Sequence, residues 1–209
     1  MARLSEIISN TKYLDHLEIS LYHGTNTYYL EYFKEHGIRR IDTEKPRDFG
    51  TGFYLTTNYW QALDYAKNYS ISTYDPMVVC CFITLGDLRS FANHLLIDDY
   101  NDQWLETIVR GRCCDQDKPL HQEYDWIYGR CGDGKTYIFN RKLKECNDDH
   151  EKLLEIIQPN MLTPVQTFPH YEYDQLWVGS DEVIKKLKNT HIIYKKGVEE
   201  IEFTIPVQQ

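Results

Sequence analysis

The sequence has no long apolar run, no excess of basic charge and no regularly spaced cysteines. Its longest apolar run is MVVCCFITL at residues 77–85, far short of the roughly 20 residues that a membrane-spanning helix requires. The N-terminal segment contains neither an apolar core of signal-peptide length nor a small-residue cleavage pattern. These absences predict a cytoplasmic protein that has no membrane partner.

Basic side chains are in the minority, with 23 Lys and Arg against 32 Asp and Glu, which gives a formal net charge of −9 at pH 7. Nonspecific affinity for nucleic acid depends on clustered Lys and Arg, so this balance argues against a general binder of the phosphate backbone. A local patch could still hold a nucleic-acid substrate. The charge favours a protein or a small molecule as the partner.

The six cysteines lack the C-x₂₋₄-C spacing of structural zinc sites, and we therefore expect no metal. Cys80 and Cys81 are adjacent in a strand-like run, so their side chains should point to opposite faces of a sheet. In a reducing cytosol they are interpreted as buried, small apolar residues.

The chain of 209 residues is predicted to form a single domain, residues 1–209. It is 42% hydrophobic and 26% charged, has no internal repeat and contains no low-complexity linker. Strands are expected at residues 17–22, 52–57, 77–85, 124–128, 136–139, 175–178, 191–194 and 199–207. Helices are expected at residues 27–36, 59–70, 100–110 and 148–157, and after Ser180. Because strands and helices are mixed irregularly, the fold class should be α+β.

Residues 129–136, GRCGDGKT, satisfy the phosphate-loop pattern G-x-x-x-x-G-K-[ST]. A phosphate loop requires a helix to begin at Lys135-Thr136, whereas the following Tyr-Ile-Phe favours a strand. We therefore expect a hairpin turn here, and a phosphate-loop NTPase built on Lys135 is a minor alternative. Asp48-Phe49-Gly50 matches a kinase tripeptide, but no His-Arg-Asp catalytic loop accompanies it.

Two segments are more informative when taken together. The first is LYHGT at residues 21–25, at the end of an expected strand. The second is DFGTGFYLTT at residues 48–57, followed by an expected helix that contains Tyr65. Together they resemble the ADP-ribosyltransferase superfamily of the His-Tyr-Glu type, which includes poly(ADP-ribose) polymerases and diphtheria-like toxins. The likeness is closest to a small bacterial branch that carries D-F-G-x-G-F-Y, and YDWIYG at 124–129 and DQLWV at 174–178 extend it.

The resemblance implies a split, mixed β-sheet core with flanking helices, and NAD as the substrate. His23 would hydrogen-bond a ribose hydroxyl as a neutral imidazole, with Gly24 and Thr25 completing the first motif. The backbone of Gly24 would hold the nicotinamide carboxamide. Tyr54 and Tyr65, eleven residues apart as in the family pattern, would sandwich the nicotinamide ring.

In the second motif, Gly50 and Gly52 would let the backbone bend around the dinucleotide, and Asp48 would bond a ribose or order the loop. The third motif departs from the family, because Gln175 occupies the position of the catalytic Glu. An amide can hydrogen-bond the same hydroxyl but carries no charge, which favours transfer of single units over chain building. Glu172 and Asp174 are the alternative carboxylates.

The expected activity is therefore mono-ADP-ribosylation of a macromolecule, with His23, Tyr54 and Gln175 as the catalytic residues. By resemblance the enzyme would be toxin-like or related to conflict with phage, and a dedicated inhibitor or antitoxin would be its partner. The principal alternative is a catalytically silent NAD-binding or interaction module, and its motivation is Gln175.

Overall fold

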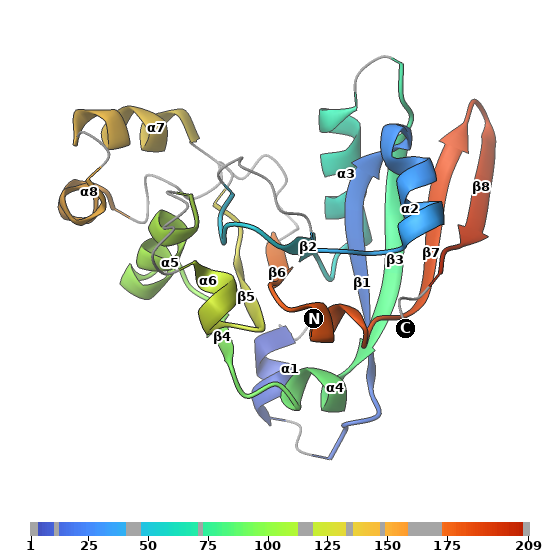
Figure 1. Ribbon diagram of the computed structural model, residues 1–209, viewed down its shortest axis with the longest axis horizontal. Helices are drawn as coiled ribbons and strands as arrows, with labels where there is room; N and C mark the ends of the chain where they lie inside the picture. Colours follow the sequence, from blue (N-terminus) through green and yellow to red (C-terminus); the bar gives the residue numbers. More distant parts are fainter. Residues whose placement is uncertain are drawn as a thin grey trace.

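The computed structural model describes residues 4–10, 13–40, 47–70, 73–112, 119–132, 136–146, 149–158 and 173–206 (Figure 1). The helices are α1 (Leu4–Asn10), α2 (Leu30–His36) after the 3₁₀ turn η1 (Thr27–Tyr29), α3 (Tyr59–Tyr69), α4 (Leu85–Arg89), α5 (Asp102–Arg112), α6 (Leu120–Glu123), α7 (Thr136–Glu145), α8 (His150–Ile156) and α9 (Asp181–Ile184). The strands are β1 (Glu18–Asn26), β2 (Phe53–Leu55), β3 (Pro76–Thr84), β4 (His94–Ile97), β5 (Trp126–Arg130), β6 (Asp174–Val178), β7 (Lys188–Lys196) and β8 (Glu199–Thr204). The predicted α+β class is confirmed.

The first sheet is antiparallel throughout, in the order β1-β3-β7-β8. Its nearly all-apolar strand, β3, lies between β1 and β7, which is where a run buried on both faces is expected. Cys80 and Cys81 pack into different hydrophobic clusters, and both are buried free thiols, as predicted. Cys113 and Cys114 lie outside the described residues.

The second sheet has the order β2-β6-β5-β4, in which β4 runs parallel to β5 and the other pairs are antiparallel. In the described part of the chain, one isolated bridge joins the two sheets: the backbone N–H of Tyr22 donates to Thr56 O at 2.9 Å, and that of Thr56 donates to Tyr22 O at 2.8 Å. Beyond this bridge β1 and β2 belong to different sheets, and their separation provides the walls of the site described below.

The packing follows from the alternation of side chains along the strands. Leu21, Val79 and Ile192 of the first sheet pack with Leu55 and Leu176 of the second in one shared core. Helix α3 covers the opposite face of the first sheet through a smaller cluster that contains Ala62, Val78 and Cys80. Helices α5, α7 and α8 cover the opposite face of the second sheet through a third cluster (Figure 1).

Several predicted elements are confirmed, and one is wrong. Helix α3 begins after Asn58, whose side chain accepts hydrogen bonds from Trp60 N and Gln61 N, as expected of a cap. The expected strand at residues 136–139 is instead the first part of helix α7. Phe139 and Cys146 are buried and Leu143 packs beside them, at the i, i+4, i+7 spacing of a helix. This helical periodicity prevailed over the strand preference of Tyr-Ile-Phe.

Candidate functional site

A cavity of about 830 Å³ opens where β1 and β2 separate. Small-molecule and cofactor sites commonly enclose roughly 300–1,000 Å³, so the cavity is of a suitable size for such a ligand. Its lining comes from β1, β2 and the segment that leads into it, helix α3 and the beginning of β6, with single residues from α5, α7 and the position just after β5. The lining includes six of the residues predicted from the sequence: His23, Gly24, Asp48, Tyr54, Tyr65 and Gln175.

His23 lies on β1, and its ring is tied to the neighbouring sheet. Nδ1 lies 2.7 Å from the carbonyl oxygen of Tyr54. A carbonyl oxygen can only accept, so Nδ1 carries the proton and Nε2 is left with a lone pair. Burial is the main cause that lowers the pKa of His23 to about 4, against an ordinary value of 6.5, and the charge of Arg47 acts in the same direction. The imidazole is therefore neutral at physiological pH.

Gly24 has a structural reason to be glycine. A Cβ at this position would collide with the carbonyl oxygen of Ala62 in helix α3. Its absence lets α3 lie directly against β1, which brings the polar face of the helix to the cavity. The next residue, Thr25, pairs with Met77 and does not line the cavity.

The segment before β2 is held by the phenol of Tyr54. The hydroxyl donates to Gly50 O at 2.8 Å and accepts from Phe49 N at 2.9 Å. Gly50 has φ +73°, a conformation that side chains disfavour, so the turn requires glycine there. Burial, together with the charge of Asp48, raises the pKa of Tyr54 well above 10.0. The phenol is therefore a structural hydrogen-bonding group, and its ring lies at the cavity wall with the Arg47 guanidinium over it, 5.7 Å from the ring centroid.

Gly52 packs beneath Trp177, where a Cβ would collide with the indole ring. Neither Gly50 nor Gly52 lines the cavity as the structure describes it. Both glycines shape the backbone around Tyr54, and the direct contact to a dinucleotide that the resemblance implies has no counterpart in this lining.

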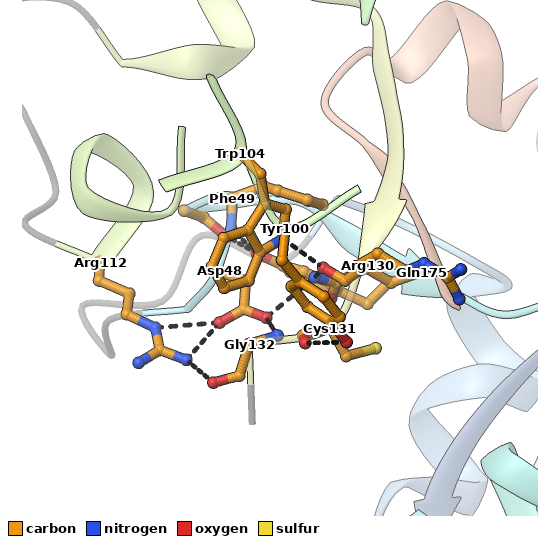
Figure 2. A network of polar contacts seen from close by, with 11 residues as sticks. Asp48, Phe49, Tyr100, Trp104, Arg112, Arg130, Cys131, Gly132 and Gln175 are labelled. Carbon is orange, nitrogen blue, oxygen red and sulfur yellow. Dashed lines mark hydrogen bonds and ion pairs between the residues drawn. The ribbon is translucent and has the colours of Figure 1, made fainter. Parts of the chain in front are cut away.

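Asp48 is the centre of a buried polar network (Figure 2). Its Oδ1 accepts from Arg112 Nε at 3.0 Å and from Arg112 Nη2 at 2.6 Å. Its Oδ2 accepts from Gly132 N at 2.6 Å and from Gln175 Nε2 at 2.9 Å. Of the two predicted roles for Asp48, the structure supports ordering of the site, because these contacts occupy both carboxylate oxygens.

Sequence reasoning missed Arg112, the partner of Asp48 in the ion pair. Both side chains are buried, at 5% and 7% exposure. The residue before it, Gly111, packs against Asp48 O, and a Cβ there would collide with that carbonyl. The available sequence signal was this glycine within a helix, which often marks a close backbone approach.

Asp174 and Gln175 are neighbours at the beginning of β6, and both line the cavity. Asp174 accepts four hydrogen bonds from protein donors: Thr56 Oγ1, Thr57 N, Thr57 Oγ1 and Tyr128 Oη, at 2.6, 3.1, 2.6 and 2.8 Å. A carboxylate with so many internal donors has little capacity left for a ligand. Glu172, the other alternative carboxylate, lies outside the described residues.

Helix α3 is docked to β6 through Gln61, another residue that was not assigned a role from the sequence. Its Nε2 donates to Asp174 O at 2.6 Å, and its Oε1 accepts from Asp174 N at 3.2 Å. One turn further along, Tyr65 lines the cavity and stacks on Tyr69, with ring centroids 4.2 Å apart. The helix therefore presents an aromatic side chain to the same space as Tyr54 and His23.

The family model for proteins of unknown function designated DUF3990 matches residues 19–189. The chain belongs to the DUF3990 family. The match begins in β1 and ends in β7, so it includes every element that lines the cavity. No curated protein matches the sequence.

In this DUF3990 chain, the described residues contain no group of three or more His, Cys, Asp or Glu side chains that could hold a metal ion. No helix in the described ranges is both long enough and apolar enough to cross a bilayer. The chemical resources of the cavity are a neutral imidazole, aromatic rings, several amide side chains and several charged side chains, some of them buried.

Proposed function

We propose that this DUF3990 chain is an NAD-dependent mono-ADP-ribosyltransferase that modifies a macromolecule, most simply a protein, and releases nicotinamide. The observation that carries the proposal is the convergence of His23, Tyr54, Tyr65 and Gln175 on one cavity. These residues come from separate strands and a helix, and the motif resemblance had grouped them beforehand. Two sheets that share one bridge are also compatible with the split sheet of that superfamily.

The geometry supports a distinct role for each residue. His23 Nε2, held as an acceptor by the bond from Nδ1 to Tyr54 O, would accept a hydrogen bond from a hydroxyl of the nicotinamide ribose. The rings of Tyr54 and Tyr65 would hold the nicotinamide between them. Gln175 would accept a hydrogen bond from a second ribose hydroxyl through its amide oxygen.

The transfer itself requires little proton chemistry from the protein. The bond between the anomeric carbon and the nicotinamide nitrogen breaks, and its electron pair neutralises the positive ring nitrogen. A lone pair of the acceptor forms the new bond to that carbon, and the acceptor loses its proton to solvent. The residues of the cavity therefore act by fixing the sugar and the leaving ring in a reactive orientation.

Labelled NAD provides the test. The wild type incubated with lysate should release nicotinamide and attach labelled ADP-ribose to a target that mass spectrometry identifies. Tyr65→Ala should slow release about three- to tenfold, because an aromatic pair contributes roughly 0.5–1.5 kcal/mol. Tyr13→Ala is the matched control, since that side chain is 93% exposed. Equal release by wild type and Tyr65→Ala would contradict the proposal.

A catalytically silent NAD-binding module is the alternative that Gln175 motivates, because the amide lacks the charge of the Glu that the ADP-ribosyltransferase superfamily has at this position. Calorimetry would detect NAD binding, and the absence of nicotinamide release against any lysate would then favour this alternative. A toxin-like role with a dedicated inhibitor requires that the chain be an active transferase.

One observation favours the phosphate-loop alternative more than the sequence suggested, since a helix does begin at Thr136. Against it, the N–H of Gly132 already donates to the Asp48 carboxylate, and that negative charge would oppose a bound phosphate. The decisive residues 133–135 lie outside the described ranges. ATP hydrolysis abolished by Lys135→Ala would establish this alternative over the transferase.

A further inference from the structure

The amide of Gln175 is held in one orientation by two acceptors. Its Nε2 donates to Asp48 Oδ2 at 2.9 Å and to the carbonyl oxygen of Arg130 at 3.1 Å. A primary amide has two N–H donors, and these two contacts use both. The side chain lines the cavity, so Oε1 is the polar atom left to accept a hydrogen bond from a ligand.

Both acceptors would oppose a carboxylate in the same place. Glu at position 175 would put an unprotonated oxygen about 3 Å from Asp48 Oδ2 and beside a carbonyl, with no proton to share between them. Carboxylates this close do not both ionise, and one pKa rises strongly. Arg112 offsets part of the Asp48 charge, but its contacts are on the opposite oxygen, Oδ1, so it gives Oδ2 no donor in place of the amide.

We propose that Asp48 is a positioning residue that makes an amide, rather than a carboxylate, the working group at position 175. It holds Gln175 Nε2 and thereby directs Oε1 toward a hydroxyl of the substrate. The inference rests on the proposed function for the identity of that substrate. Gln175, which departs from the pattern of the ADP-ribosyltransferase superfamily, is then suited to its neighbour Asp48. The site works without a titrating carboxylate at this position.

The other titratable groups at this end of the cavity do not alter the expectation. They are Arg47, Tyr54, Arg112, Cys131 and Asp174. The pKa of Tyr54 is raised well above 10.0, so this phenol stays neutral in the range tested. Asp174 also lines the cavity, but its carboxylate accepts four hydrogen bonds from protein donors. Arg112 is neutralised by Asp48 itself.

Gln175→Glu in the full chain tests the inference without any ligand. A protonated Glu replaces one of the two amide donors, with its O–H donating to Asp48 Oδ2 and Arg130 O left without this donor, whereas an ionised Glu replaces neither. We expect the urea midpoint of the variant to lie closest to the wild type at about pH 4 and to shift to clearly lower urea at about pH 8, because stability is lost as pH rises from the ordinary Glu pKa of about 4.3 toward the raised pKa of the folded pair. Gln103→Glu, at an exposed position on α5, should show no such pH-dependent shift.

Two further experiments test whether Asp48 causes this pH dependence. In an Asp48→Asn background, Gln175→Glu should lose most of its pH-dependent shift, because the second negative charge is gone. If Gln175→Glu folds at neither pH, Asp48→Asn alone decides the matter by nuclear magnetic resonance. Hydrogen exchange of the Gln175 side-chain amide should be slow in the wild type and at least about tenfold faster in Asp48→Asn, as expected when a charge-assisted bond is lost.

The activity arm is separate. Nicotinamide release by Gln175→Glu should fall by about tenfold or more relative to wild type at about pH 8 and recover at about pH 5.5, because one pKa unit corresponds to a tenfold change in protonation. Equal unfolding of Gln175→Glu and wild type at both pH values would overturn the inference. So would a pH-dependent shift of Gln175→Glu that is the same in the Asp48→Asn background as in the wild-type background. If the wild type releases no nicotinamide, the proposed function fails while the unfolding and exchange results still decide the role of Asp48.

Discussion

Replacement of His23 by Asn tests whether this side chain is neutral in the folded chain, where it donates to Tyr54 O. Asn retains an N–H that can donate to the carbonyl oxygen of Tyr54, but it cannot take up a proton. In the folded chain the pKa of His23 is lowered to about 4 from 6.5, mainly by burial. The unfolded chain therefore binds this proton more readily than the folded chain does.

The sign follows from this difference. A lowered folded pKa means that stability is fully present above the unfolded value and is lost as pH falls from about 6.5 toward about 4. Between about pH 7.5 and about pH 4.5, protonation of His23 in the unfolded chain should cost the wild type about 2.5 kcal/mol. The Asn variant lacks this contribution, so its stability should fall less with acid.

Urea unfolding followed by Trp fluorescence can measure the difference, since the chain has four Trp residues. The other histidines and the carboxylates titrate in both proteins and cancel in the comparison. The free energies of unfolding of wild type and variant should converge as pH falls, or cross if Asn is tolerated well. Two curves that stay parallel within about 0.5 kcal/mol would refute a neutral, buried His23.

Three further predictions concern the frame of the site. Gly24→Ala should destabilise the chain by about 1–3 kcal/mol in urea unfolding, because the new Cβ collides with Ala62 O and helix α3 must shift; an unchanged midpoint would contradict this packing. Arg112→Met should cost about 3–5 kcal/mol by leaving Asp48 buried without its cation, and a loss below about 1 kcal/mol would show that the ion pair is dispensable. Burial raises the pKa of Cys80 to about 12, so iodoacetamide at neutral pH should label this thiol only after unfolding. Labelling of Cys80 in the native chain, measured by peptide mass spectrometry, would contradict this prediction.

The sequence predicts the elements whose signals are local and strong. The apolar run of β3 and the Asn58 cap of α3 are both in place, and so is the strand that contains Gln175. Each of these depends on a pattern that neighbours in the chain decide by themselves. His23, Gly24, Asp48 and Tyr54 of the two motifs also line one cavity, although periodicity alone could not have placed them together.

The errors arise where distant contacts decide the outcome. Residues 136–139 have strand propensity, yet burial of Phe139 and Cys146 against the second sheet favours a helix. Strand β4 is four residues long and only partly buried, so its pattern is too short to predict. The ion pair between Asp48 and Arg112 joins residues 64 positions apart, and no spacing rule in a single sequence announces such a contact.

The tyrosines illustrate the same division. Tyr54 is fixed through its hydroxyl to Phe49 N and Gly50 O, a function that the motif did not suggest. Tyr65 presents its ring from α3, where the eleven-residue spacing had placed it. Both tyrosines line the cavity, and Tyr54 in addition ties down the segment before β2.

The central claim is that this cavity binds the nicotinamide end of NAD and promotes release of nicotinamide. The most direct measurement is the rate at which the purified chain, supplied with lysate, releases nicotinamide from NAD labelled in that ring. We predict release by wild type and Tyr13→Ala at equal rates, and slower release by Tyr65→Ala at matched folded concentration. Absence of release by the wild type, or release that Tyr65→Ala leaves unchanged, would contradict the account.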